Sequence, residues 1–420
     1  MKRREFVVTT AALSATACLA GQATDDWPQF RGLRGAGLAA TAAPVSFGLN
    51  RNLLWKVALP GPGASSPIVI GNRVYVTSYS GFGVPGETGS LDQLRRHLGC
   101  LERDTGRVIW TRDGLAKQPE PATIRENHGY AASTPTADTE RVYVFFGKSG
   151  VHALDHSGRP LWQYDVGNGT NGWGSAASPV LWGDLLFVNA SVESESLVAL
   201  DRRTGREVWR ARGIRESWNA PSFVQLPGGQ VELVVAIFGK VLGFDPTSGT
   251  QLWSCATDIA WYMVPGLVAQ GDSVFCIGGR TGGALAVKAG GRGDVTGTHR
   301  TWTGRKGSNV SSPIVHQGHL YWAHDSLGIV YCAEATTGRL VYEERIDRAS
   351  QIYASPVLAG GRLYYLTRSG RMLVLPATPT FEPPIVNDVN DGSMYNSSPA
   401  VAGGRLYVRS NLALYCFAGN

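Results

Sequence analysis

The chain has 420 residues, of which 43 % are hydrophobic and 17 % are charged, and its formal net charge is +6 at pH 7. Its 53 glycines fall at predicted turns, which excludes a low-complexity tract. Its basic residues are scattered without a run or stripe, so no nucleic-acid partner is predicted. The length accommodates one large repeat domain or several ordinary domains.

Residues 1–23 are predicted to be an export signal. Lys2-Arg3-Arg4 precede a mild apolar stretch, residues 6–20, which is too short and too rich in Thr and Ala for a membrane span. The run Arg3-Arg4-Glu5-Phe6-Val7-Val8 resembles the twin-arginine pattern, and an ordinary signal is the alternative. Cys18 is a possible lipid-anchor site, although the leucine usual three residues earlier is missing. We therefore expect an exported, periplasmic or envelope-associated protein, with lipidation as the less favoured alternative.

Eight copies of one pattern follow the predicted leader, residues 24–51. In each copy a proline follows a small residue at the head of an apolar run; these are Pro67, Pro135, Pro179, Pro221, Pro265, Pro313, Pro356 and Pro399. After a first gap of 68 residues the prolines are 42 to 48 residues apart. A period in the low forties fits one four-stranded antiparallel unit and is typical of a β-propeller. The sequence therefore predicts an all-β, eight-bladed propeller.

The third copy shows the content of one unit most clearly. Apolar runs at 180–182, 185–188 and 197–200 are separated by turn residues, and a last strand ends at Trp209. We name the four predicted strands A to D, from the innermost to the outermost. The turn before strand D contains Thr-Gly or Ser-Gly in most copies, as in Thr204-Gly205, because glycine adopts the positive φ of such turns. The tryptophans that end strand D recur at one position, so we expect them to pack between blades.

The last blade lacks its own strand D, because the chain ends soon after the run Leu414-Tyr415-Cys416-Phe417. Residues 52–57 contain a strand and Trp55, with no other strand before them. We therefore predict that this N-terminal strand completes the last blade and that the ring spans residues 52–420. Such closure removes free sheet edges.

The repeat resembles the quinoprotein-type (PQQ-like) propeller repeat, in which a small residue and proline open strand A and Leu-Asp-x-x-Thr-Gly-x-x-x-Trp closes the unit. The run Trp27-Pro28-Gln29-Phe30-Arg31-Gly32 resembles the leader of many exported bacterial members. One branch of this family, the quinoprotein dehydrogenases, binds PQQ and calcium on the ring axis. Another branch, the BamB-type outer-membrane assembly proteins, has eight blades, a similar length and no cofactor. Because adjacent cysteines and a convincing set of Glu/Asn/Asp calcium ligands are missing, no cofactor is expected here, neither PQQ nor calcium.

The cysteines predict neither a metal site nor a disulfide. Cys100, Cys332 and Cys416 share one position in strand C, where other copies have small residues, and Cys276 falls in strand B. There is no Cys-x-x-Cys pair and no cluster of His and Cys. We expect these thiols to fill small buried spaces.

One face of the ring is expected to carry any binding site. The D-to-A and B-to-C loops emerge on the same face, and the first blade has extra residues in both, at Tyr79–Leu98 and Arg112–Ala131. The segments before the prolines should line the mouth of the channel there, and they are rich in aromatic and hydrogen-bonding groups. The candidate ligand-binding residues are Asn127, His128, Tyr130, Trp173, Glu216, Trp218, Trp261, Tyr262, Lys306, Asn309, Tyr353 and Tyr395. They would suit a sugar, or alternatively they would fill the channel as a plug.

The sequence favours a binding or interaction module of the cell envelope. Its expected partner is an envelope protein or a carbohydrate, held at the loop-bearing face of a monomeric ring without a transmembrane span. The alternative is an enzyme on that face, either a carbohydrate-active lyase or hydrolase or a divergent PQQ-dependent oxidoreductase. Its candidate acids and bases are His128, Glu216, Tyr262 and Lys306.

Overall fold

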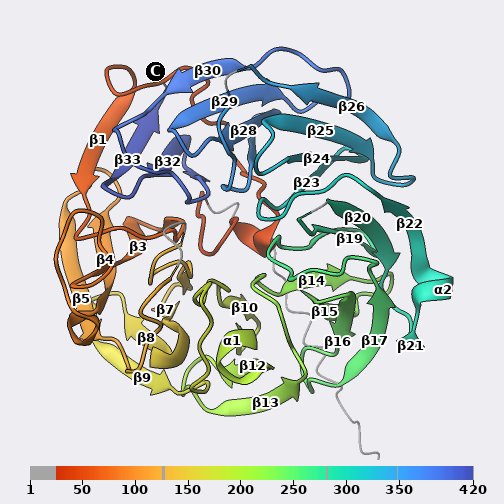
Figure 1. Ribbon diagram of the computed structural model, residues 1–420, viewed down its shortest axis with the longest axis horizontal. Coiled ribbons are helices and arrows are strands. Elements are labelled where there is room, and N and C mark those ends of the chain that lie inside the picture. Colours follow the sequence, from red (N-terminus) through yellow and green to blue (C-terminus); the bar gives the residue numbers. More distant parts are fainter. Residues whose placement is uncertain (1–24, 125–127, 281, 348, 420) are drawn as a thin grey trace, which may run out of the picture.

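In the computed structural model, eight antiparallel sheets stand radially around one axis (Figure 1). The structure describes residues 25–124, 128–280, 282–347 and 349–419. The predicted eight-bladed propeller is confirmed. The predicted export signal, residues 1–23, lies outside the described residues.

The first four blades follow one another in chain order. Their strands are β2 (Ile68–Ile70), β3 (Arg73–Ser80), β4 (Arg95–Glu102) and β5 (Val108–Leu115); β6 (Thr136–Ala137), β7 (Arg141–Phe145), β8 (Val151–Asp155) and β9 (Pro160–Tyr164); β10 (Val180–Trp182), β11 (Leu185–Ala190), β12 (Ser196–Asp201) and β13 (Glu207–Arg212); and β14 (Ser222–Gln225), β15 (Val231–Ile237), β16 (Lys240–Phe244) and β17 (Gln251–Ala256).

The remaining four blades complete the circle. Their strands are β18 (Val268–Gln270), β19 (Ser273–Gly278), β20 (Gly283–Lys288) and β22 (Arg300–Gly304); β23 (Ile314–His316), β24 (His319–Ala323), β25 (Ile329–Glu334) and β26 (Leu340–Arg345); β27 (Val357–Ala359), β28 (Arg362–Leu366), β29 (Arg371–Pro376) and β30 (Ile385–Asp388); and β31 (Ala400–Ala402), β32 (Arg405–Arg409), β33 (Ala413–Ala418) and β1 (Leu53–Ala58). The short helices between them are η1 (Leu33–Gly35), η2 (Leu91–Gln93), η3 (Gly147–Ser149), α1 (Ser191–Ser194) and α2 (Thr296–His299).

The two ends of the chain share the last blade. β1 pairs antiparallel with β33, with Lys56 opposite Tyr415 and Val57 opposite Leu414. The predicted closure by the N-terminal strand is therefore confirmed. It covers the outer edge of β33, which would otherwise present unpaired backbone groups.

Neighbouring blades are joined by the tryptophan of one blade and the Thr-Gly or Ser-Gly turn of the next. The indole N–H of Trp162 donates to the Arg202 carbonyl at 3.1 Å, and its ring covers Gly205, where a Cβ atom would lie 2.5 Å from the ring. The same donor bond runs from Trp55 to Arg103, Trp110 to His156, Trp209 to Pro246, and Trp302 to Ala335. The expected packing of these tryptophans between blades is confirmed, and the turn glycine is their complementary surface.

The fourth blade departs from this pattern because the fifth blade has a longer connection. The indole N–H of Trp253 donates instead to the buried Glu232 carboxylate at 2.6 Å. Within that connection β21 (Gly293–Asp294) pairs in parallel with β17 as a fifth strand. The sequence did not predict this strand, because its glycine-rich segment has no apolar run.

Small polar residues before the prolines join the blades a second time, around the channel. The Ser66 backbone N–H donates to Thr134 Oγ1 at 2.9 Å, and the Thr134 N–H donates to Ser178 Oγ at 3.0 Å. Ser397 of the last blade donates its hydroxyl to the Ser65 carbonyl at 2.9 Å and so joins the last blade to the first. These positions therefore form the wall of the channel and part of its hydrogen-bonding framework.

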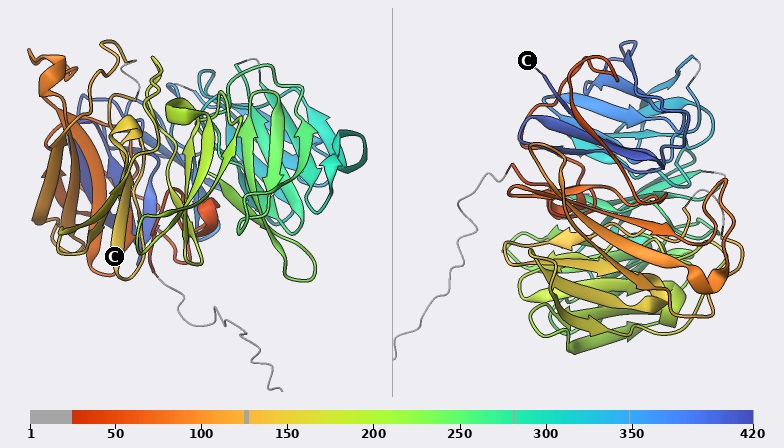
Figure 2. Two further views of the ribbon diagram at one scale, coloured as in Figure 1. Left: turned by 90° about the horizontal axis from the view of Figure 1, so that it is seen from below. Right: turned by 90° about the vertical axis from the view of Figure 1, so that its left-hand side faces the viewer.

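The leader runs through the middle of the ring, where Figure 1 shows it in red. Trp27 exchanges two backbone hydrogen bonds of 2.8 Å with Val69 of β2 in the first blade. Farther along, the Ala39 N–H donates to Leu358 of β27 in the seventh blade at 2.8 Å. The leader therefore spans the channel, and η1 lies toward the face opposite the long loops of the first blade (Figure 2).

Candidate functional site

The channel contains a cavity of about 150 Å³ on the side of the D-to-A segments. Phe30 of the leader lines it, so the leader closes this end of the channel. Small residues directly before the prolines form the wall, namely Ser66, Thr134, Ser178, Ala220, Val264, Ser312, Ser355 and Ser398. The leader therefore closes one end of the cavity, and the D-to-A segments of the loop-bearing face surround its other end, which we call the mouth.

Aromatic rings form one side of this mouth. The ring centroid of Trp173 lies 5.6 Å from that of His128 and 5.5 Å from that of Tyr262. Trp218 meets Tyr262 edge-on at 5.6 Å and donates its indole N–H to the Gly174 carbonyl at 2.8 Å. These offset contacts fix the rings of four successive D-to-A segments as one apolar wall.

Amides and a stacked tyrosine form the other side. The Arg368 guanidinium lies 4.5 Å from the centroid of the Tyr353 ring, and its Nε donates to Asn396 Oδ1 at 2.9 Å. Asn309 also lines the cavity, and its buried Oδ1 has no hydrogen-bond partner among the described residues. The pocket thus combines an apolar wall with a polar wall, as sites for ring-shaped polar ligands do.

The structure brings six of the twelve predicted ligand-binding residues to this cavity. These are His128, Trp173, Trp218, Tyr262, Asn309 and Tyr353. Of the four candidate acids and bases, His128 and Tyr262 line it.

The other predicted site residues lie elsewhere. Glu216 is exposed, and Lys306 forms an exposed ion pair with Glu343 at 2.8 Å. Trp261 packs on Tyr262 with ring centroids 5.1 Å apart and does not itself line the cavity. Tyr130 and Tyr395 are buried in hydrophobic clusters away from this cavity, and Asn127 lies outside the described residues.

The segments before the prolines were predicted to line the mouth, but Asn396 of one such segment and Phe30 of the leader were not among the predicted site residues. Asn396 faces the cavity, whereas the adjacent Tyr395 points away and donates its hydroxyl to the Val389 carbonyl. Successive side chains of an extended segment point in opposite directions, and the sequence does not say which one faces the axis. Phe30 was missed because no sequence signal placed the leader inside the channel.

The first insertion of the first blade is shorter than predicted, because β3 and β4 are longer, and the second insertion begins later than predicted. β3 continues to Ser80, β4 begins at Arg95, and β5 continues to Leu115. The two loops are nevertheless neighbours: the Ala116 N–H donates to the Leu94 carbonyl at 2.9 Å. They rise together above the loop-bearing face (Figure 2).

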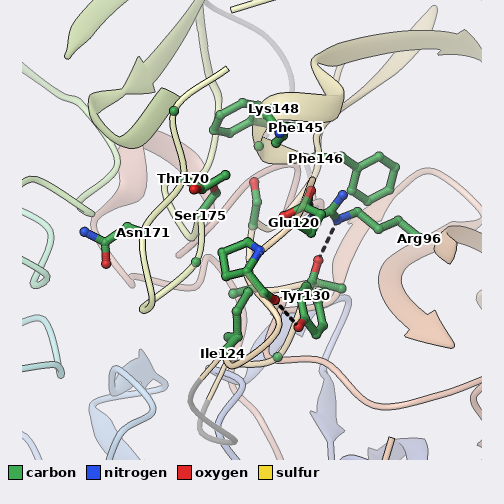
Figure 3. A pocket seen from close by; sticks show the side chains of 18 residues that line it. Arg96, Glu120, Ile124, Tyr130, Phe145, Phe146, Lys148, Thr170, Asn171 and Ser175 are labelled. Atoms are coloured by element: carbon green, nitrogen blue, oxygen red, sulfur yellow. Dashed lines mark hydrogen bonds and ion pairs between the residues drawn. The ribbon is translucent and has the colours of Figure 1, made fainter. Parts of the chain in front are cut away.

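A buried ion pair anchors the second of these loops. Arg96 of β4 donates to Glu120 at 2.8 Å and to the Tyr130 carbonyl at 2.9 Å, as Figure 3 shows from close by. The ammonium group of Lys148 in η3 donates a hydrogen bond to the Pro119 carbonyl at 2.6 Å. The space between these groups is only about 20 Å³. This cluster therefore holds the loop in place and leaves little room for a ligand.

One carboxyl group near the mouth is buried without a cationic partner at ion-pair distance among the described residues. Glu193 of α1 accepts a hydrogen bond from the Ser175 hydroxyl. Burial raises the pKa of Glu193 to about 7, with a further upward contribution from Glu120. The group is therefore partly protonated at neutral pH.

The cavity does not offer the donors that calcium prefers. No acidic side chain is among the described residues that line it. Calcium takes six to eight oxygen ligands, usually with carboxylates among them. The described residues also contain no group of three or more His, Cys, Asp or Glu arranged to hold a metal ion. The five described cysteines are buried free thiols, so no adjacent pair is present to cover a quinone.

Comparison with protein families identifies the repeat. The family described as outer membrane protein assembly factor BamB matches residues 94–344 and 196–418, which together cover well over half of the chain. The chain belongs to this BamB-like, PQQ-repeat family. No curated protein matches it.

Solved structures share this fold at low sequence identity. BamB from Moraxella catarrhalis is 14 % identical, with a TM-score of 0.61, and the match covers 88 % of this chain and 97 % of that one. The quinohemoprotein alcohol dehydrogenase from Comamonas testosteroni is 11 % identical, with a TM-score of 0.67 and coverage of 94 % and 80 %. A europium-containing methanol dehydrogenase is 12 % identical, with a TM-score of 0.63 and coverage of 94 % and 98 %. At these identities the likenesses establish the fold alone.

The described residues contain no helix that is both long and apolar enough to cross a membrane.

Proposed function

We propose that this BamB-family propeller is a carbohydrate-binding module of the cell envelope, with the sugar held in the blind cavity at the loop-bearing face. The observation that carries the proposal is the two-sided lining. Trp173 and Tyr262 offer apolar ring faces, and Asn309 and Asn396 offer amide groups across the cavity. A pyranose ring is complementary to such a lining, because it has apolar C–H faces and polar edges.

The cavity is preformed for such a ligand. Its aromatic wall is fixed by ring contacts and by the hydrogen bond from Trp218 to Gly174. Its floor is fixed by Phe30, which belongs to a leader bonded to both sides of the ring. A rigid site needs little ordering when the ligand binds, which favours affinity.

Replacing one cavity ring tests the proposal. Trp173→Ala is expected to weaken the binding of any envelope oligosaccharide by at least about tenfold, because it removes the central ring of the aromatic wall. Phe238→Ala is the matched control, since Phe238 is an exposed aromatic residue outside the cavity. Binding is measured by isothermal titration calorimetry after a glycan-array screen. Equal affinity of the Trp173 variant and the wild type would contradict the proposal.

An envelope protein is the alternative partner, and the family description as an assembly factor favours it. Its binding surface would be formed by the two loops that follow β3 and β5 and rise above the ring. Shortening the loop at residues 84–90 would then abolish the interaction, whereas Trp173→Ala would leave it intact. The carbohydrate proposal expects the opposite result from the two variants.

The lining also argues against a calcium-bound quinone as the resident cofactor, because carboxylate ligands are missing from its described residues. We therefore propose that the protein works without PQQ. Mixing it with PQQ and calcium should leave no quinone absorbance with the protein after gel filtration, and stoichiometric retention would overturn this.

A further inference from the structure

Three arginines surround the cavity, and the first lies under its floor. Arg31 directly follows Phe30 and is fully buried. Its Nη2 donates to the carbonyls of Ala36 and Pro313, the latter next to the lining residue Ser312. Its Nε and Nη1 have no hydrogen-bond partner among the described residues.

The second arginine lies behind the wall. Arg409 at the end of β32 is also fully buried, and its Nη1 donates to the carbonyl and the hydroxyl of Ser65 at 2.8 and 2.6 Å. Ser65 stands between Ala64 and Ser66, which both line the cavity. Nε and Nη2 of Arg409 have no partner within the described part of the chain, and neither does the buried Ser66 hydroxyl.

The third arginine is at the mouth. Arg368 stacks on Tyr353 and donates to Asn396, and both of these side chains line the cavity. Positive groups thus lie below, beside and above the space that a ligand would occupy.

Among the described residues, no carboxylate balances the two buried guanidinium groups. In the described residues neither Arg31 nor Arg409 forms an ion pair, and the cavity lining contains no Asp or Glu. Burial lowers the pKa of each to about 9, so both remain protonated at pH 7. An unpaired buried charge is costly, and the low-dielectric protein around it screens its field only weakly.

We infer that the cavity selects a sugar that carries a carboxylate over the same sugar without one. The inference rests on the proposed function and names its ligand class: uronic-acid oligosaccharides. The pyranose ring packs on Trp173 and Tyr262, and the carboxylate supplies a negative charge near the two buried arginines, Arg31 and Arg409, that have unpartnered nitrogen atoms among the described residues.

A glycan array of matched pairs tests the inference. Oligomers of galacturonate, glucuronate, mannuronate and guluronate are each printed beside their uncharged methyl esters. The bound glycans are expected to be the acids, at least about tenfold tighter than their esters, because charge-assisted hydrogen bonds are the stronger class. This preference should weaken as salt concentration rises. Equal binding of acid and ester that still depends on Trp173 would overturn the inference and leave the proposed function standing. Binding of no glycan, or binding indifferent to Trp173→Ala, would overturn both.

Variants at the mouth distinguish the contribution of the Arg368 charge to ligand preference from the contribution of the shape of the cavity. Arg368→Met should reduce the preference for the acid over its ester at least threefold. Arg215→Met is the control, because Arg215 is exposed, pairs with Glu195 and does not line the cavity. An unchanged acid preference in both variants would remove Arg368 from the proposal.

A measurement without any ligand tests whether the electrostatic potential in the cavity is positive. The fluorescence of Trp173 is obtained as the difference between the wild-type protein and Trp173→Phe. Its quenching by iodide, caesium and neutral acrylamide is then compared. Iodide is expected to quench this component several-fold more than caesium at low ionic strength, with the difference vanishing in high salt. Equal quenching by the two ions would overturn the inference. Protection from all three quenchers would show a closed channel and overturn the proposed function as well.

Discussion

Gly205 illustrates how single residues of the repeat are fixed by the neighbouring blade. Its φ of 73° favours glycine, and the Trp162 ring occupies the place where a side chain would begin. The Thr-Gly turn and the tryptophan are therefore two halves of one contact, made by different blades. This explains why a motif with no catalytic chemistry recurs along the chain.

Gly205→Ala should destabilise the ring more than backbone strain alone would. Gly228→Ala is the matched control, because Gly228 also has a positive φ, 95°, but open space where its Cβ would lie. We expect a loss of about 1 kcal/mol for Gly228→Ala and about 2–4 kcal/mol for Gly205→Ala, from strain plus overpacking. Denaturant unfolding measures both. Equal losses would show that the contact with Trp162 adds nothing.

Glu193 should make the stability of the protein depend on pH. Burial raises the pKa of its carboxyl to about 7, whereas the unfolded chain has a value near 4.5. The folded state therefore binds the proton more tightly, so stability falls as pH rises from about 4.5 to 7, by on the order of 3 kcal/mol. Glu193→Gln should abolish this decline, and replacing the exposed Glu87 by Gln should not. A Glu193→Gln protein that retains the full decline would contradict this origin.

At the scale of elements, the sequence predicted strands far better than it predicted which side chains face the axis. Proline, turn glycine and tryptophan recur at fixed offsets, so the blades and the closure by β1 follow from counting. The two-residue strand β21 has no apolar pattern, and the choice between Tyr395 and Asn396 depends on the direction of one extended segment. Such details are set by packing between blades, which a single repeat does not encode.

The position of the loop after β5 depends on one buried ion pair. Substitutions of two adjacent arginines, one buried and one exposed, test this. Arg96 pairs with Glu120 at side-chain exposures of 7 % and 5 %, whereas Arg95 pairs with Asp113 at 48 % and 44 %. Arg96→Met leaves a buried carboxylate unpaired and should cost about 3–5 kcal/mol, against less than about 1 kcal/mol for Arg95→Met. Limited proteolysis should detect the released loop in Arg96→Met only. Similar protease resistance of both variants would refute the anchoring role.

At the scale of the whole molecule, the leader and β1 have separable tasks. The leader fills the channel from one side and provides Phe30 and Arg31, whereas β1 covers the edge of β33 and links Trp55 to the first blade. A propeller gains its stability from a closed circuit of blade contacts, so the loss of one junction affects all blades. The removal of the leader affects mainly the floor of the cavity.

Two truncations distinguish these tasks. A protein that begins at residue 52 keeps β1 and should remain a ring, with a lower melting temperature and a cavity open at both ends. A protein that begins at residue 60 also loses β1, so β33 becomes a free edge and the contact between Trp55 and Arg103 is lost. We expect this second protein to unfold over a broader temperature range and to self-associate through the exposed edge, which calorimetry and light scattering measure. If it stayed monomeric and melted like the first truncation, closure by β1 would contribute nothing to the ring.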